Sequence, residues 1–198
     1  AGHPQPGHCV TSGRRNAWMA LSEETMTAVL DLAIYLAFPA AMALAAVSDL
    51  TTMTIPNRLS GALALVFPFA ALAIGMPLGL VGMHLLAGFL MLALGIVLFS
   101  RGWIGGGDAK LAAAIGLWFG FGPTMLDFLV YAGLFGGALT LGIMMFRGWM
   151  LPAFALRHGW VMRLHDKSVG VPYGIALAAG AMMVYPATPF AALAAGLM

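Results

Sequence analysis

Residues 80–99 read LVGMHLLAGFLMLALGIVLF, a stretch without a single charged side chain. A helix needs about 20 consecutive, mainly apolar residues to cross the hydrocarbon core of a bilayer, so this stretch predicts a transmembrane helix. Further apolar runs lie on both sides of it, at about 27–47, 59–76, 110–122, 124–146 and 169–190. The sequence therefore predicts an all-α polytopic membrane bundle of about six transmembrane helices.

The composition supports a membrane protein. Of the 198 residues, 62% are hydrophobic and 8% are charged, and the mean hydropathy is +0.95. So few polar side chains cannot cover a soluble globule. The fourth apolar run is short and is interrupted by Gly120, Gly122 and Pro123. A bundle of five spans with one re-entrant or broken segment is therefore an alternative.

The basic residues predict the orientation, because cytoplasmic loops of membrane proteins are enriched in lysine and arginine. Under a six-span count, seven of the nine basic residues lie on one side: Arg58, Arg101, Lys110, Arg147, Arg157, Arg163 and Lys167. We expect this side to face the cytoplasm. The pI near 9.0 reflects this asymmetry. Because no basic helix accompanies it, we expect no nucleic-acid partner.

The chain is predicted to divide into an N-terminal tail and one membrane domain. Residues 1–25 are predicted to be a flexible polar tail, and residues 26–198 a single transmembrane domain. The only cysteine is Cys9, so the chain can form neither an internal disulfide framework nor a four-thiolate zinc site. We expect no metal and no cofactor. Residues 148–168 combine tryptophan with basic residues, which is typical of a loop that contacts membrane lipids.

Two carboxylates, Asp49 and Asp108, lie at ends of apolar runs on the predicted cytoplasmic side. A carboxylate at the centre of a membrane helix costs about 2.5–3.5 kcal/mol on insertion scales, so such residues are often functional. The two are 108 − 49 = 59 residues apart, which leaves room for two spans that cross and return. Two carboxylates that share a site split their titration, so that one can act as acid and the other as base in amide hydrolysis.

The neighbours of the aspartates suggest further roles. After Pro56, Asn57 is a favourable N-cap for the second helix, and residues 50–55 are then an ordered connection. The run Gly105, Gly106 and Gly107 lacks side chains, so an extended substrate could pair with its backbone as a strand. Asp108 begins the fourth helix, whose N-terminus favours an anion. We therefore expect Asp108 to be the more readily ionised acid, and Lys110 to pair with an aspartate or a lipid phosphate.

Taken together, these motifs resemble those of the type IV prepilin peptidases, especially the short forms associated with tight-adherence (Flp-type) pili. The resemblance covers roughly residues 38–185. It rests on Asp49 to Asn57, on the Gly-x-Gly-Asp motif at 105–108 with Lys110, and on Val171-Pro172-Tyr173-Gly174-Ile175-Ala176.

The resemblance implies that Asp49 and Asp108 are the catalytic pair of an aspartyl protease. It implies a prepilin or pseudopilin substrate, cut at the cytoplasmic face between a basic leader and an apolar helix. The residues expected to bind substrate or shape the site are Pro56, Asn57, Gly105, Gly106, Gly107, Lys110, Pro172, Tyr173 and Gly174.

Longer members of that family carry paired Cys-x-x-Cys motifs and methylate the new N-terminus. This chain has no such motif, so we expect cleavage without methylation, zinc or S-adenosylmethionine. Presenilin-like proteases have tyrosine before the first aspartate, whereas Ser48 precedes Asp49 here. Two alternatives stay open: a small ion- or proton-coupled transporter subunit that uses the aspartates, and a noncatalytic membrane adaptor. The sequence does not indicate the oligomeric state.

Overall fold

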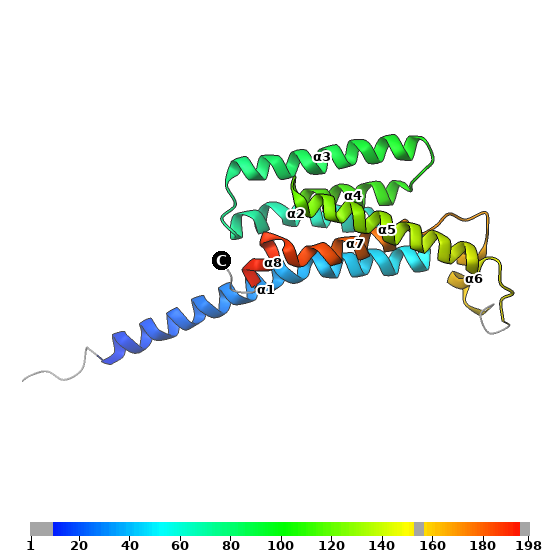
Figure 1. Ribbon diagram of the computed structural model, residues 1–198. Coiled ribbons are helices and arrows are strands. Elements are labelled where there is room, and N and C mark those ends of the chain that lie inside the picture. The colour runs from blue at the N-terminus through cyan, green and yellow to red at the C-terminus, as the bar shows by residue number, and fades with distance from the viewer. Residues whose placement is uncertain (1–9, 153–156, 195–198) are drawn as a thin grey trace, which may run out of the picture.

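The computed structural model describes residues 10–152 and 157–194, and within these ranges every regular element is helical (Figure 1). The α-helices are α1 (Val10–Thr52), α2 (Asn57–Ala73), α3 (Leu78–Ser100), α4 (Gly106–Phe119), α5 (Pro123–Phe146), α6 (Gly159–His165), α7 (Tyr173–Val184) and α8 (Pro189–Ala194), with a 3-10 helix, η2 (Tyr185–Ala187), after α7. The all-α membrane bundle is confirmed, and each predicted apolar run coincides with a helix.

The helices differ in whether they can cross a membrane. Among the described helices, residues 25–52 of α1 and the whole of α3 and α5 are long and apolar enough to do so. In contrast, α4 has 14 residues, or about 21 Å at 1.5 Å per residue, which is less than the ~30 Å hydrocarbon core. It ends where the sequence is interrupted: Gly120 has a φ of 64°, and Pro123 is the first residue of α5.

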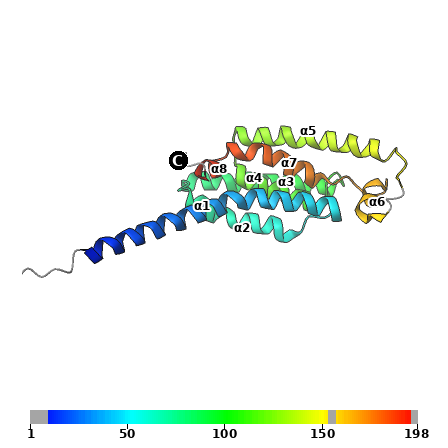
Figure 2. The same cartoon turned by 90° about the horizontal axis from the view of Figure 1, so that it is seen from below.

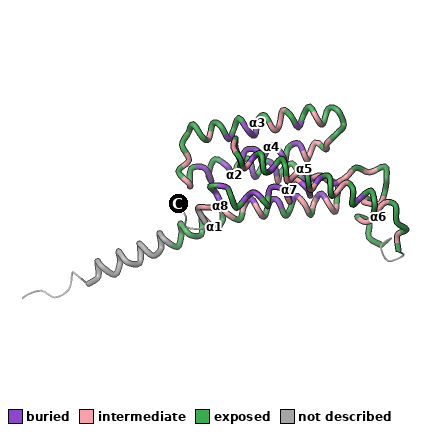
Figure 3. Tube along the Cα trace, in the orientation of Figure 1, coloured by how far each residue is buried: buried purple, intermediate pink, exposed green. Residues whose placement is uncertain are grey.

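The short helix α4 is the centre of the bundle, because α2, α3 and α7 all pack against it (Figure 2). Most of its residues are buried, in contrast to the exposed outer faces of α3 and α5 (Figure 3). The Trp118 indole is fully buried and donates its N–H to the Leu63 carbonyl at 3.0 Å. His84 is also buried, and its Nδ1 lies 2.9 Å from the Leu117 carbonyl oxygen. A packing role for His84, rather than a catalytic one, agrees with its solitary position in the sequence.

Close helix contacts in the bundle depend on glycine. At the crossing of α3 and α4, a Cβ added to Gly95 would lie 2.8 Å from the Ala109 Cβ. At the crossing of α5 and α7, a Cβ added to Gly180 would lie 2.8 Å from the Ala132 backbone nitrogen. Small residues therefore let the backbones approach one another, as helices in membranes commonly require.

The antiparallel course of the helices brings three connections to one end of the bundle: residues 53–56, residues 101–105 and the segment that includes α6 (Figure 1). The seven basic residues predicted to share a side all lie at this end. Helix α1 begins at Val10, inside the predicted tail. Residues 1–9, which include Cys9, lie outside the described residues, so the division into tail and domain stays a prediction.

Candidate active site

The first component of the site is the C-terminal end of α1, which carries Asp49. The Asp49 side chain is only 4% exposed. Helix α1 continues to Thr52, and Met53 then adopts a φ of 55°. The Ser48 hydroxyl donates to the Thr54 carbonyl at 2.7 Å, and Ile55 is buried. The connection before α2 is therefore ordered, as predicted, although its first residues belong to α1.

The second component is the N-terminal turn of α4, where the prediction of a strand-like substrate platform is wrong. Gly105 is extended, but Gly106 and Gly107 already belong to α4, so their backbone is not available for strand pairing. A Cβ added to Gly107 would lie 3.2 Å from the Ile55 Cβ. The glycines therefore let Ile55 pack closely on the first turn of α4. Asp108 lies in that turn, and its Oδ2 accepts a hydrogen bond from the Gly105 N–H at 3.2 Å.

The third component is the N-terminus of α7. The Gly174 N–H donates to Asp49 Oδ2 at 2.7 Å. A Cβ added to Gly174 would lie 2.8 Å from the same oxygen and 2.6 Å from Ile55 Cδ1. Pro172, directly before α7, is buried. The Tyr173 hydroxyl lies 3.2 Å from the Thr140 hydroxyl on α5, so this side chain braces α7 against α5 and does not line the cavity described below.

The residues that begin α2 depart from their predicted role. Asn57 is the first residue of α2 after Pro56, and no side chain caps this helix. The Asn57 Oδ1 instead accepts a hydrogen bond from the Lys110 Nζ at 2.8 Å. The expected capping by Asn57 is therefore wrong, because its amide joins α2 to α4. The Lys110 ammonium also donates to this amide and not to either aspartate.

A partly open cavity of about 250 Å³ lies between the end of α1, the connection to α2 and the start of α4, and both aspartates line it. The other lining residues are Met53, Thr54, Ile55, Asn57, Gly105, Gly106 and Gly107. Of the predicted site residues, five do not line it: Pro56, Lys110, Pro172, Tyr173 and Gly174. The sequence motifs did not single out Ile55, which contacts Gly107 at the start of α4 and Gly174 at the start of α7. In the sequence, Ile55 is marked only as a β-branched apolar residue directly before Pro56.

The electrostatics of the cavity distinguish the two acids. Burial raises the pKa of Asp108 to about 6, and the nearby charge of Asp49 acts in the same direction, against the weaker opposing effect of the Gly105 N–H. The Asp49 carboxylate accepts the short hydrogen bond from Gly174, which stabilises its charge. The raised pKa of Asp108 runs against the expectation that it is the more readily ionised acid. One proton between two acids is the arrangement that lets one carboxylate activate water while the other donates a proton.

No metal site accompanies this cavity: the part of the chain that the structure describes contains no group of three or more His, Cys, Asp or Glu residues that could hold an ion. Asp127 lies near the start of α5, at the opposite end of the bundle. Asp31 precedes Asp49 by 18 residues on the same helix, about 27 Å along its axis. Both are therefore remote from the cavity.

Comparisons with known proteins identify relatives. Residues 36–141 match the model of the type IV leader peptidase family, and this range includes both aspartates. The chain is 32% identical to a prepilin leader peptidase/N-methyltransferase of Bacillus subtilis (strain 168) over 199 residues, which is 91% of this chain and 71% of that protein. No solved structure matches the chain. These likenesses do not favour the transporter alternative.

Proposed function

Because the chain belongs to the type IV leader peptidase family, we propose that it is an aspartic endopeptidase that removes the basic leader from prepilins or pseudopilins. The observation that carries the aspartic mechanism is the shared cavity. Asp49 and Asp108, from the end of α1 and the start of α4, line one partly open cavity that also has room for water. The relative from B. subtilis, named as a prepilin leader peptidase, supports the substrate class.

The proposed reaction uses the two acids in opposite protonation states. Ionised Asp49 takes a proton from a water molecule as the water oxygen attacks the carbonyl carbon of the scissile amide. Protonated Asp108 donates its proton to the carbonyl oxygen. The tetrahedral intermediate then collapses and the C–N bond breaks. The proton held by Asp49 passes to the leaving nitrogen, and a hydroxyl proton of the intermediate returns to Asp108, which restores both acids. General acid and base catalysis of this kind contributes about 10²–10⁴-fold to rate.

We place the reaction at the cytoplasmic face of a bacterial inner membrane. The end of the bundle that holds the cavity also carries the seven basic residues, which agrees with the enrichment of lysine and arginine in cytoplasmic loops. A basic leader finds few acids there: besides the two aspartates, the described connections at this end contain Asp166. We therefore propose that the leader is held near the aspartates and the surrounding anionic lipid headgroups.

We propose further that cleavage is not followed by N-methylation. The family resemblance connects methylation with a domain that carries paired Cys-x-x-Cys motifs, whereas the chain contains one cysteine. The zinc site expected of such a domain needs four ligands, commonly thiolates. A single cysteine cannot supply them. This agrees with the short peptidases associated with tight-adherence pili.

The experiment is a cleavage assay with purified protein in detergent and a candidate prepilin, read by the mass of the product. We expect Asp49→Asn and Asp108→Asn each to lower kcat by about 10²-fold or more, because neither acid replaces the other. Asp127→Asn, at the opposite end of the bundle, is the matched control and should cut normally. Full cleavage by both dyad variants would exclude the aspartic mechanism. A product heavier by one methyl group, formed with S-adenosylmethionine present, would exclude the methylation-free assignment.

A further inference from the structure

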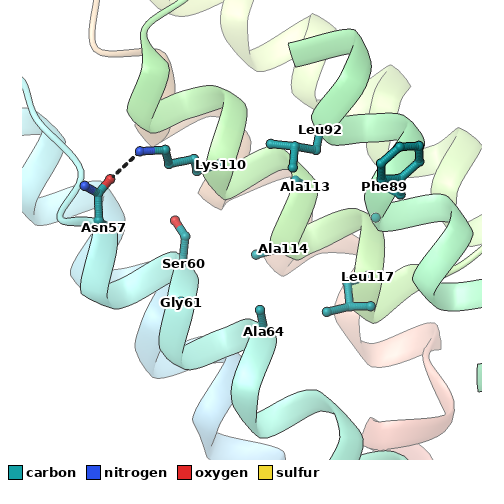
Figure 4. A pocket seen from close by; sticks show the side chains of 11 residues that line it. Asn57, Ser60, Gly61, Ala64, Phe89, Leu92, Lys110, Ala113, Ala114 and Leu117 are labelled. Atoms are coloured by element: carbon teal, nitrogen blue, oxygen red, sulfur yellow. Dashed lines mark hydrogen bonds between the residues drawn. The ribbon is translucent and has the colours of Figure 1, made fainter. Parts of the chain in front are cut away.

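A second cavity lies beside the first, between α2 and α3, with α4 as its floor (Figure 4). Its volume is about 490 Å³. Both α2 and α3 pack on α4 but make few contacts with each other, so a groove is left between them. Small residues from all three helices line it: Gly61, Ala64, Gly88, Ala113 and Ala114. A surface of this kind lets the backbone of another helix approach closely.

The groove begins at the candidate active site. Asn57 lines both the groove and the cavity that holds the aspartates. Its hydrogen bond with Lys110 spans the mouth of the groove, as Figure 4 shows. From Asn57 the groove follows α2 to Ala64, seven residues or about 10 Å along the helix axis. A chain that leaves the aspartates at this point enters the groove directly.

Ser60 provides a polar group inside this otherwise apolar groove. The side chain is 7% exposed, and among the described residues its hydroxyl has no hydrogen-bond partner. In Figure 4 the Ser60 hydroxyl points toward the space between α2 and α4. A buried hydroxyl without a partner is unfavourable, so an acceptor supplied by a ligand in the groove would stabilise it. Backbone carbonyls can do so even within a helix, because each oxygen has a second lone pair.

We propose that this groove binds the first turns of the apolar helix that follows the scissile bond of the substrate. The inference rests on the proposed function. Three features favour a polypeptide helix over a lipid chain: continuity with the catalytic cavity, the small residues on all three walls, and the unpaired hydroxyl. An acyl chain at the depth of Ser60 offers no hydrogen-bond acceptor. The groove then fixes where the substrate helix begins and so determines which bond reaches the aspartates.

The test fills the groove without disturbing its walls. Gly61 lines the groove, and a Cβ added to it meets no atom within 4 Å, so we expect the side chain of Gly61→Leu to occupy groove space without a clash. Gly82→Leu on α3 is the matched control, because an added Cβ there also meets nothing within 4 Å, and Gly82 does not line the groove. Two substrates are compared: a full-length prepilin, and a short peptide that keeps the leader and scissile bond but lacks the apolar helix.

We expect Gly61→Leu to raise KM for the full-length substrate by about tenfold and to leave KM for the short peptide unchanged. Gly82→Leu should change KM for neither substrate. Equal KM values of Gly61→Leu and the unaltered protein for full-length prepilin would overturn the inference. Failure of the unaltered protein to cut either substrate would overturn the proposed function, and this inference with it.

A second measurement identifies the occupant without relying on kinetics. A photocrosslinking residue is placed at Gly61 or at Gly82 in the Asp49→Asn background, and the protein is reconstituted in phospholipid vesicles with full-length prepilin. We expect a prepilin adduct from position 61 and much less from position 82. An adduct with phospholipid alone at position 61 would show a lipid site and overturn the inference. Ser60→Ala, which keeps the volume of the groove nearly constant, should raise KM for the full-length substrate only.

Discussion

Asp49 and Asp108 are the same residue type in one cavity, yet their surroundings differ. Asp49 accepts a hydrogen bond from Gly174 at the first turn of α7, where the helix dipole also favours a negative charge. Asp108 accepts only the longer bond from Gly105, and the charge of Asp49 opposes its ionisation. The sequence showed that Asp108 begins a helix but did not show that Asp49 faces the start of another. The role of each acid therefore had to come from the structure.

The raised pKa of Asp108 predicts how activity depends on pH. In the proposed mechanism Asp108 is the acid and must be protonated, and its pKa is about 6. Activity should therefore be lost as the pH rises through about 6, with kcat falling about tenfold per unit above that value. The measurement is kcat for the short leader peptide between pH 5 and pH 8.5 in detergent, at saturating substrate.

The control for the pH profile is Asp166→Asn. Asp166 is exposed, and its hydrogen bonds to the hydroxyl and N–H of Ser168 lower the pKa of its carboxyl. It is therefore already ionised throughout the range, and the variant should give the same profile. A kcat that keeps rising from pH 6 to pH 8 would contradict the assignment of Asp108 as acid. It would favour the opposite order of protonation.

At the scale of the helices, the site is a meeting of three helix ends around Ile55. The C-terminal end of α1 provides Asp49, the first turn of α4 provides Asp108, and α7 provides the Gly174 N–H. Gly107 and Gly174 both contact Ile55 so closely that a Cβ on either would lie within 3.2 Å of its side chain. Ile55 therefore sets the spacing of α4 and α7, and through them the spacing of the two acids.

Gly174→Ala should separate these helix ends. The added Cβ would lie 2.8 Å from Asp49 Oδ2 and 2.6 Å from Ile55 Cδ1, so the start of α7 or the carboxylate must move. We expect kcat/KM to fall by about 10²-fold, since displacements near 1 Å at a catalytic group can cost that much. Gly170→Ala is the control, because a Cβ there meets no atom within 4 Å. Equal activity of the two variants would show that α7 does not position Asp49.

The helix ends also show what the sequence could predict and what it could not. Hydropathy located the cores of α1–α5 and α7, because an apolar run must be buried in lipid or protein, but it did not locate the short helix α6 (Gly159–His165). The two aspartates stood out, because carboxylates are rare in such runs. Local rules failed where tertiary contacts decided the outcome. Asn57 is a residue type that commonly caps helices, but its side-chain oxygen instead accepts a hydrogen bond from Lys110, 53 residues later. The glycine run suggested an open strand edge, but Gly106 and Gly107 lie in the first turn of α4, and Ile55 packs on Gly107.

At the scale of the whole molecule, apolar composition did not distinguish helices that cross the membrane from helices that are buried inside the protein. Helices α4 and α7 were predicted to span the membrane because they are apolar, but they have 14 and 12 residues. Runs of 10–14 apolar residues more often form buried core helices, and α4 is enclosed by α2, α3 and α7. The longer helices α1, α3 and α5 provide the membrane-crossing length. Both aspartates of the candidate site thus lie at one end of this protein core.

The segment between α5 and α7 is held to this core by Arg147, at the end of α5. Its Nε donates to the Leu164 carbonyl at 2.9 Å, and its Nη2 donates to the carbonyls of Val169 and Gly170 at 2.9 and 3.1 Å. Arg163, on α6, donates to the Thr51 carbonyl, close to Asp49 on α1. The connection therefore joins the ends of α1, α5 and α7 on the side where both acids lie.

Arg147→Ala should release this connection without unfolding the bundle. The substitution removes three hydrogen bonds that a charged side chain donates. Because the site is partly exposed, we expect the free energy of local opening to fall by only about 1–3 kcal/mol in total. Hydrogen exchange of the amides between 159 and 171 should accelerate, while α3 and α4 keep their protection. Because Gly174 lies shortly after this connection in the chain, kcat/KM should fall about three- to tenfold.

The control is Arg101→Ala, which removes a basic side chain at the same end of the bundle, after α3. It should leave exchange in this segment unchanged. Unaltered exchange in Arg147→Ala would mean that contacts of α6 with α1 and α5, and not Arg147, hold the connection in place.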